Sequence, residues 1–549
     1  MIARAHALDA LAREHFDVVV IGGGITGAGV ALDAASRGYS VALLERADYA
    51  SGTSSRSSKL VHGGLRYLQH FDLGLVREAL LERQLMVALA PHLVAPLAIV
   101  VPAFDGARLD RLVGVGLNLY DVMGVERRRG RRGPADSWSP DRHRVIGGEE
   151  VAELLPALAG RQPTSGYLFY DCQTDDVRLV LSVLAEAERF GAVCANGVVV
   201  EELRSRDDRA SGVRARDQRS GETLVVSAAH VVNATGVWAD RLRPGELHDE
   251  AEVPRIRPSR GTHIIFEHAD LPLVGGTIVP AGGGRTIFAL PWLGHTLVGT
   301  TDNDYDGPLE HVLPGDADID YLLEAVNEFF GSGLGRERIA GAFAGVRPLI
   351  SSTDSKSSVD ISRKAELYET SSGMVTITGG KLTTWRRMAK LTVDRIVESD
   401  GRDAPCRTHE IPIGQAIDPD ELERVHGVSP AAYRALAARY GHRAHDVLAI
   451  ARAEPALGSP IVEGLPDLRA EAVYAARHEQ AATIGDVLLR RTRVGLLAAR
   501  RATAADTLEP LATALGRECG WDAPRQAAEI AAFRSEAQAE GIVVAAVAV

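Results

Sequence analysis

The segment from Phe16 to Arg46 constrains the fold of this 549-residue chain more than any other feature. An apolar run leads into a glycine triplet, GxGxxG, and an alanine-rich, helix-compatible stretch follows. A second apolar run, 41–44, ends at the acidic Glu45. The pattern predicts a strand, a glycine turn, a helix and a second strand, which together form the unit that binds adenine dinucleotides.

Each glycine of the triplet has a mechanical role in that unit. Gly22 permits the tight turn, Gly24 lets the backbone approach a pyrophosphate, and Gly27 lets the helix pack closely on the strand. The helix N-terminus offers unpaired N–H groups and a positive dipole end to the phosphates. Glu45 is placed to accept hydrogen bonds from ribose hydroxyls. This motif alone does not distinguish FAD from NAD.

Two further strand-to-glycine turns favour FAD. They are VVNATG at 231–236 and TITGGKLTT at 376–384. Three such turns spread along the chain suit one long cofactor that lies across a discontinuous domain. A second complete fingerprint for NAD(P)H is missing, because the glycines at 282–284 lack a following helix and acid and are typical of a hairpin turn.

Composition and charge exclude several classes of protein. A hydrophobic content of 46% with 24% charged residues is typical of a soluble globular protein. The formal net charge of −12 disfavours nucleic-acid binding. The four cysteines (Cys172, Cys194, Cys406 and Cys519) have no metal-binding spacing and indicate a reducing compartment. With no apolar signal core and no apolar run near ~20 residues, we expect a cytoplasmic protein whose membrane contact would be peripheral, at the inner face of the cell membrane.

The predicted fold class is α/β, with a discontinuous Rossmann-like FAD-binding domain, a sheet-based substrate domain and a helical C-terminal domain. Residues 1–400 form the predicted oxidoreductase region, and 401–549, rich in alanine and arginine, the mostly helical domain. The FAD-binding parts are expected at about 16–75, 175–245 and 341–395, and the substrate-covering parts at about 76–174 and 246–340. Helices are expected over 73–90 and 109–125, and from Asp175, as a cap, to Phe190.

Four basic residues lie in segments that otherwise indicate burial or tight turns: Arg66, Arg347, Arg363 and Lys381. A buried guanidinium group is costly unless an anion meets it. If these side chains converge, they form a site for phosphate or carboxylate. The alternative is that each pairs with a local Asp or Glu.

The glycine fingerprint and seven further sequence blocks, in order from about residue 16 to 390, resemble the FAD-dependent (aerobic-type) glycerol-3-phosphate dehydrogenase family. The seven further blocks are TSSRSSKLVHGGLRYL, YDCQTDDVRLVL, VNATGVWAD, RGTHIIF, LVGTTDNDY, GVRPL and GGKLTTWR. In the C-terminal domain, ARHEQAATIGDVLLRRTRVG is also similar. The resemblance implies a glycine-oxidase-like flavoprotein fold and the oxidation of sn-glycerol 3-phosphate to dihydroxyacetone phosphate. Electrons would pass to a membrane quinone, whereas an oxidase branch of the family uses oxygen.

The resemblance also implies roles for five residues of the substrate pocket. Arg66, Tyr67, Arg347, Arg363 and Lys381 match the family's pocket residues. Arg66, Arg363 and Lys381 would bind the phosphate and the carbinol oxygens. Arg347 would lie near the reacting C2 oxygen.

Two histidines in family blocks are candidates for the general base, His62 and His263. Oxidation sends a hydride from C2 to flavin N5 while the C2 hydroxyl loses a proton, and a histidine with a pKa near neutrality suits that role. We favour His62, because its loop follows the predicted flavin-binding serines. The alternative for each is a histidine bonded to backbone. Thr301 and Asp302 are expected to order the pocket.

We predict that FAD contacts the three glycine turns and the serine-rich loop. The predicted contacts are Gly22, Gly24, Gly27, Glu45, Thr53, Ser54, Ser55, Ser58, Lys59, Leu60, Gly63, Gly64, Val199, Ala234, Thr235, Gly236, Trp238, Gly380, Lys381, Leu382, Thr383 and Thr384. No metal site is predicted.

An arginine-rich segment suggests contact with a membrane. The stretch Leu112–Val125 is apolar and is bracketed by Arg108, Arg111, Arg127, Arg128, Arg129, Arg131 and Arg132. A basic amphipathic segment suits an anionic membrane surface. The alternative is a solvated loop beside a packed helix. The expected partners are glycerol 3-phosphate and the quinone pool, with no nucleic acid, and a homodimer is compatible with the sequence. An oxygen-using oxidase and a non-catalytic flavin-binding scaffold are the competing functions.

Overall fold

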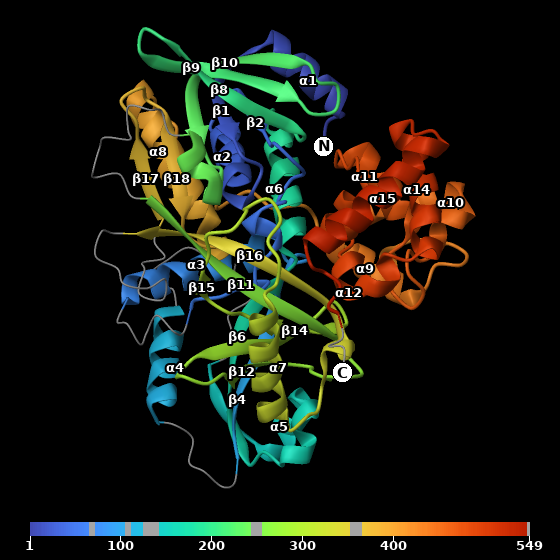
Figure 1. Cartoon of the computed structure of the whole chain (residues 1–549). Helices are drawn as coiled ribbons and strands as arrows, with labels where there is room; N and C mark the ends of the chain where they lie inside the picture. The colour runs from blue at the N-terminus through green and yellow to red at the C-terminus, as the bar shows by residue number, and fades with distance from the viewer. Residues whose placement is uncertain (65–71, 105–110, 125–141, 243–254, 352–364, 546–549) are drawn as a thin grey trace.

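The computed structural model describes residues 1–64, 72–104, 111–124, 142–242, 255–351 and 365–545. This part of the chain contains two sheets with their covering helices, and a lobe of helices beside them (Figure 1). The predicted α/β class is therefore confirmed. Arg66, Tyr67, Arg363 and most of the arginine-rich segment lie outside the described residues.

The first sheet is built on parallel strands in the order β18-β10-β1-β2-β7. Strand β17 extends it as an antiparallel edge, and the antiparallel pair β8 and β9 extends from β10. The bounds are β1 His15–Ile21, β2 Val41–Leu44, β7 Val193–Ala195, β8 Val198–Arg206, β9 Arg209–Asp217, β10 Thr223–Asn233, β17 Ala365–Glu369 and β18 Val375–Gly379. All three predicted strand-to-glycine turns leave this sheet, after β1, β10 and β18.

The side chains of β1 alternate between the two faces of the first sheet, and helices cover both faces. Val18 and Val20 pack in the core with helices α2, α6 and α8, while Val19 and Ile21 pack on the opposite face with helix α1. The bounds are α1 Arg4–Arg13, α2 Ile25–Ser36, α6 Asp176–Arg189 and α8 Trp385–Asp400. Asp175 caps α6 as predicted, since its carboxylate accepts the backbone N–H groups of Val177 and Arg178.

The second sheet is mostly antiparallel, and its longest pair is β11 with β16. Its strands are β3 Leu60–Val61, β4 Val94–Ala103, β5 Arg144–Gly147, β6 Ser165–Thr174, β11 Arg255–Glu267, β12 Gly276–Pro280, β13 Thr286–Trp292, β14 His295–Gly299, β15 Asn303–Asp304 and β16 Ile339–Ser351. Its helices are α3 Leu73–Leu89, α4 Arg111–Gly124, α5 Gly148–Leu154 and α7 Asp316–Phe330. The glycines at 282–284 form the predicted hairpin turn between β12 and β13.

The C-terminal helices form the lobe coloured orange to red in Figure 1. Their bounds are α9 Pro430–Tyr440, α10 Ala444–Ala453, α11 Arg469–His478, α12 Val494–Leu497, α13 Ala499–Ala502, α14 Ala505–Cys519 and α15 Ala523–Ala539, with a π-helical turn at Asp486–Arg491. Within the described residues, no helix combines the length and apolar character needed to cross a bilayer.

Buried ion pairs join this lobe to the domain of the first sheet. The carboxylate of Asp48 accepts hydrogen bonds from Arg490 at 2.7 Å and from Arg491 at 2.7 and 2.8 Å. Arg178 on α6 forms a two-pronged pair with Glu479, at 2.6 and 2.9 Å. Charges this deeply buried are tolerated only when each has a partner of opposite sign. The lobe and the domain of the first sheet therefore neutralise each other's buried charges.

We predict that Asp48→Asn destabilises the protein strongly. Burial raises the pKa of the Asp48 carboxyl, but Arg491 and Arg490 outweigh burial and hold it at about 2. The variant leaves two buried guanidinium groups poorly neutralised, which costs about 3–5 kcal/mol of unfolding free energy at pH 7. Because the pKa is lowered on folding, this stability is complete above the usual pKa of 3.8 and is lost only as the pH falls through about 2.

Urea unfolding at pH 7 and pH 5, followed by circular dichroism, measures the difference in unfolding free energy between wild type and Asp48→Asn. The gap between wild type and Asp48→Asn should be the same at both pH values, and the exposed Asp208→Asn should unfold like wild type. A gap that widens at pH 5 would show that the pKa of Asp48 is raised on folding, because a carboxyl that holds its proton more tightly in the folded state adds stability as the pH falls.

Candidate functional site

A cavity of about 1480 Å³ lies between the two sheets and reaches the C-terminal lobe. All three glycine turns line it, together with the serine-rich loop and strands β11 and β16. Single-ligand pockets usually enclose about 300–1,000 Å³. The volume therefore suits a long cofactor together with a small substrate.

The glycine turn after β1 forms one wall of the cavity. Gly22 has a φ of +112°, and a Cβ there would lie 2.7 Å from the carbonyl oxygen of Ala234. A Cβ at Gly27 would lie 1.9 Å from the carbonyl oxygen of Gly22. By contrast, a Cβ at Gly24 would approach only the Ser54 side chain, at 3.0 Å. Gly22 and Gly27 are thus needed for packing, whereas Gly24 keeps the start of α2 open.

Glu45 ends β2 at the edge of the same wall. Its carboxylate accepts the backbone N–H groups of Gly23 at 2.7 Å and Ala47 at 2.8 Å. Burial raises the pKa of the carboxyl, and these two N–H groups oppose the rise. Each carboxylate oxygen has a further lone pair that could accept a ribose hydroxyl.

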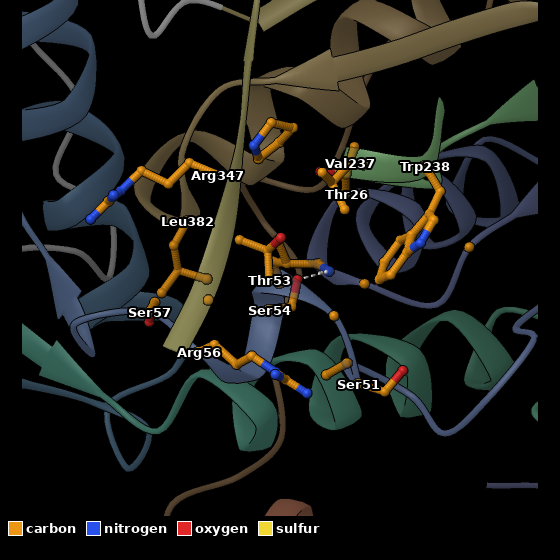
Figure 2. Close-up of a pocket in the computed structure, with 18 of the residues that line it drawn as sticks. Thr26, Ser51, Thr53, Ser54, Arg56, Ser57, Val237, Trp238, Arg347 and Leu382 are labelled. Carbon is orange, nitrogen blue, oxygen red and sulfur yellow. Dashed lines mark hydrogen bonds between the residues drawn. The ribbon is translucent and has the colours of Figure 1, made fainter. Parts of the chain in front are cut away.

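The serine-rich loop crosses the start of α2. The Ser54 hydroxyl accepts the backbone N–H of Ile25 at 3.0 Å, and the Thr53 hydroxyl donates to the Val346 carbonyl at 2.7 Å. In the close-up, Val237 and Trp238 lie on one side of Thr53 and Ser54, and Arg347 and Leu382 on the other (Figure 2). The loop is therefore hydrogen-bonded both to helix α2, which covers the first sheet, and to strand β16 of the second sheet.

Most of the residues predicted to contact the cofactor line the cavity. These are Gly22, Gly24, Glu45, Thr53, Ser54, Ser58, Leu60, Gly64, Val199, Ala234, Thr235, Gly236, Trp238, Gly380, Lys381, Leu382 and Thr383. Five others lie behind its wall: Gly27, Ser55, Lys59, Gly63 and Thr384. Lys59 is fully buried, and its ammonium group donates to Asp176 at 2.8 and 2.9 Å, away from the cavity.

Both candidate base histidines line the cavity, in different settings. His263 is 2% exposed, stacks on Phe343, and has its Nε2 2.9 Å from the Ser58 hydroxyl. Burial lowers the pKa of His263 well below its usual value, and the charges of Lys59 and Arg347 lower it further. His62 is half-buried, and its backbone N–H donates to the Thr383 hydroxyl at 3.2 Å.

Arg347 and Lys381 also line the cavity. One guanidinium nitrogen of Arg347 lies 3.3 Å from the Asp302 carboxylate, and the other donates to the Thr300 hydroxyl at 3.1 Å. The side chain keeps 25% of its surface exposed. The acid pairing considered as an alternative is therefore present at Arg347, but it leaves part of the cation facing the cavity. Arg66, Tyr67 and Arg363, the other predicted pocket residues, lie outside the described residues.

The prediction missed several residues that line the cavity. Arg46 lies over the Trp238 ring, with its guanidinium carbon 5.0 Å from the ring centroid. The C-terminal lobe supplies Asp486, Arg490 and Glu536. The only sequence signal that the C-terminal lobe contributes to the cavity was the block at 476–495. The sequence did not indicate which other residues that block contacts. Within the described residues, no cluster of side chains could hold a metal ion.

Comparisons with known proteins agree with this geometry. A family described as FAD dependent oxidoreductase matches residues 17–395, and the C-terminal domain of alpha-glycerophosphate oxidase matches 406–526. The chain is 38% identical, over 546 residues, to glycerol-3-phosphate dehydrogenase 2 of Mycobacterium tuberculosis. That alignment covers 98% of this chain and 90% of the relative.

Solved structures give the same result. The structure of the glycerol-3-phosphate dehydrogenase from Bacillus halodurans complexed with FAD is 28% identical, with a TM-score of 0.78 and 99% of both chains covered. Glycine oxidase from Geobacillus kaustophilus shares the fold, at 19% identity and a TM-score of 0.50, over 74% of this chain and 100% of its own. Two predictions are thereby confirmed: the cofactor is FAD, and the fold is of the glycine-oxidase-like type.

We predict that Gly24→Val folds but does not retain FAD. Its methyl groups would occupy the space at the start of α2, which the pyrophosphate must enter, while Gly22 and Gly27 keep the turn intact. Gly147→Val is a matched control, because Gly147 also precedes a helix, has extended backbone, and has open space around its Cβ position. The measurement is the ratio of 450-nm absorbance to protein. Stoichiometric FAD in folded Gly24→Val would exclude the assigned pyrophosphate position.

Proposed function

Since the chain belongs to the family of FAD-dependent glycerol-3-phosphate dehydrogenases, we propose that it oxidises sn-glycerol 3-phosphate to dihydroxyacetone phosphate in this cavity and passes the electrons to a membrane quinone. The observation that carries the proposal is one cavity that receives both the dinucleotide turns and a group of basic and histidine side chains. His62, Arg347 and Lys381 line the same cavity as Gly24 and Glu45.

Bound FAD supplies the acceptor for the hydride that leaves C2 of the substrate. The protein must remove the proton of the C2 hydroxyl, and we assign that step to His62. His263 is less suited, because its Nε2 is engaged by Ser58 and its Nδ1 is buried with no partner among the described residues. His62 lines the cavity from a loop anchored to Thr383, beside the third glycine turn.

We assign the anionic end of the substrate to Lys381, with Arg66 and Arg363 as further predicted ligands. Arg347 would contact the C2 oxygen, since Asp302 and Thr300 hold its guanidinium group in one orientation. A positioned cation there stabilises the charge that develops on the oxygen as its proton leaves. Tyr67 is expected to complete the pocket.

The test of this function is anaerobic reduction of the bound flavin. Glycerol 3-phosphate should bleach the 450-nm absorbance, and glycerol, which lacks the phosphate, should react poorly even at high concentration. Comparable kcat/KM values for the two compounds would overturn the phosphate assignment, and an unbleached flavin would favour a non-catalytic scaffold. In air, stoichiometric peroxide would favour the oxidase alternative, whereas turnover that requires a quinone analogue supports the dehydrogenase.

The same assay separates the two histidines. His62→Gln should slow flavin reduction about 10²–10⁴-fold, the usual contribution of a general base. His263→Gln can still hydrogen-bond to Ser58 and should retain most of the rate. The reverse order of effects would transfer the role of base to His263.

We further propose that α4 contacts the membrane where the quinone resides. Val115, Leu119 and Val122 are 66%, 38% and 70% exposed, and their spacing places them on one face of this helix. The flanking arginines would add attraction to anionic lipid, at about 1 kcal/mol each. Of these, Arg108 and Arg127 to Arg132 lie outside the described residues, as does the side chain of Arg111.

We predict that Val115→Asn with Val122→Asn releases the protein from anionic vesicles. Each valine contributes roughly 1.5 kcal/mol or more when its side chain is buried in apolar surroundings, so the double variant should bind about 10²-fold more weakly. Val225→Asn with Val274→Asn, at exposed positions 44% and 61% accessible, is the matched control. Sedimentation with vesicles measures binding, and activity with a soluble dye acceptor should not change. Unaltered sedimentation would exclude α4 as the membrane contact.

A further inference from the structure

The block at 476–495 has no role in the function proposed so far, yet its side chains converge on one segment of the FAD-binding domain. That segment is residues 48–59, here called the flavin-site loop. Arg490 and Arg491 bind Asp48, and the Tyr49 hydroxyl donates to Gln480 at 3.1 Å. Further along, Glu540, the residue after α15, holds the loop too, because it pairs with Arg56 at 2.6 Å.

Arg493 makes the most extensive of these contacts. Its side chain is 1% exposed and reaches both acids at the start of α6, Asp175 and Asp176. One guanidinium nitrogen lies 2.9 Å from the Asp175 carboxylate, and the same nitrogen donates to Asp176. The other terminal nitrogen donates to the Leu489 carbonyl at 2.9 Å and to the Ser55 carbonyl at 3.4 Å. One residue of the lobe thus touches α6 and the flavin-site loop together.

Asp176 transmits this contact to the loop. Its carboxylate accepts the Ser57 hydroxyl at 2.7 Å, the Ser57 backbone N–H at 3.1 Å, and the Lys59 ammonium group at 2.8 and 2.9 Å. The Lys59 ammonium group also donates to the Ser55 carbonyl at 2.6 Å. Asp176 is fully buried, so it can hold two cations and a serine only while all of them are in place.

Ser58 lies between the two residues that Asp176 holds. Its hydroxyl is 2.9 Å from His263 Nε2, and both residues line the cavity. The ring of Phe343 stacks on His263 at 4.7 Å, and the Lys59 ammonium group lies 4.9 Å from the Phe343 centroid. A shift of Ser57 or Lys59 would therefore move Ser58, and with it the cavity wall at the histidine.

We propose that Arg493, from the C-terminal lobe, is a positioning residue for the flavin-site loop: through Asp176 it holds Ser57, Ser58 and Lys59 in place at the cofactor. Its effect on rate rests on the proposed function, whereas its effect on the loop does not. A merely structural role would predict only lower stability. A positioning role also predicts a changed flavin environment and a slower reduction step.

The test uses Arg493→Lys in the FAD-loaded protein. Lysine keeps the charge but, as a point charge on a flexible stem, it cannot satisfy Asp175, Asp176 and two carbonyls together. Arg439→Lys is the matched control, because Arg439 is 6% exposed and bridges Asp467 and Glu471 within the lobe. The readouts are the visible flavin spectrum, hydrogen exchange of the peptide covering 53–61, and the limiting rate of flavin reduction by glycerol 3-phosphate.

For Arg493→Lys we expect an altered flavin spectrum, at least tenfold faster exchange in 53–61, and a limiting reduction rate lowered about 10²-fold, the usual cost of a misplacement near 1 Å. Arg439→Lys should lose thermal stability but leave all three readouts unchanged. Loss of FAD from a folded Arg493→Lys, with FAD retained in Arg439→Lys, would also support the proposal. If Arg493→Lys does not fold, Asp176→Asn is read against the same control.

Unchanged exchange and a reduction rate within twofold of wild type would overturn the proposal. Equal effects of Arg493→Lys and Arg439→Lys would also overturn it, because they would show general destabilisation of the lobe. If glycerol 3-phosphate fails to reduce the wild-type flavin, the proposed function is wrong, and the exchange and spectral comparisons still decide the role of Arg493.

Discussion

Three carboxylates between the FAD-binding domain and the C-terminal lobe join the two parts of the molecule: Asp48 and Asp176, which are buried, and Asp175, which is nearly so. Each meets an arginine from the short stretch 490–493. Buried charges of this kind contribute little net stability when matched, but removing one partner is costly. The same ion pairs therefore fix both the position of the lobe and the path of the flavin-site loop. Neither can shift without leaving a charge unpaired away from water.

The same arrangement influences the electrostatics of the cavity. Lys59 is held behind the wall, where burial lowers its pKa to about 8 against the opposing charge of Asp176. Together with Arg347, it lowers the pKa of His263, which burial has already lowered. A histidine kept neutral beside two cations is a hydrogen-bonding group and not a third positive charge. Arg347 and Lys381 are among the cations that line the cavity itself, and they are the ones to which we assign the anionic substrate.

Much of the site could be predicted because its residues act locally. The turn after β1 depends on the spacing of Gly22, Gly24 and Gly27, and the spacing is the same whatever surrounds it. The cap at Asp175 and the hairpin at 282–284 are local in the same way. The prediction was less accurate where a side chain chooses among distant partners. Lys59 follows a serine-rich loop and was expected at the cofactor, yet its ammonium group turns to Asp176, which lies on a helix more than a hundred residues later.

The sequence by itself determined the fold class, the cofactor and the family, because strand, turn and helix signals are encoded in short windows of apolar and glycine residues. Only the tertiary structure decided which charges meet. Arg490, Arg491 and Arg493 belong to a recognisable block, but nothing in that block indicates Asp48 or Asp176 as partners. Charge pairing over such separations depends on how the two lobes pack. That packing is a property of the whole buried interface, and no single segment carries it.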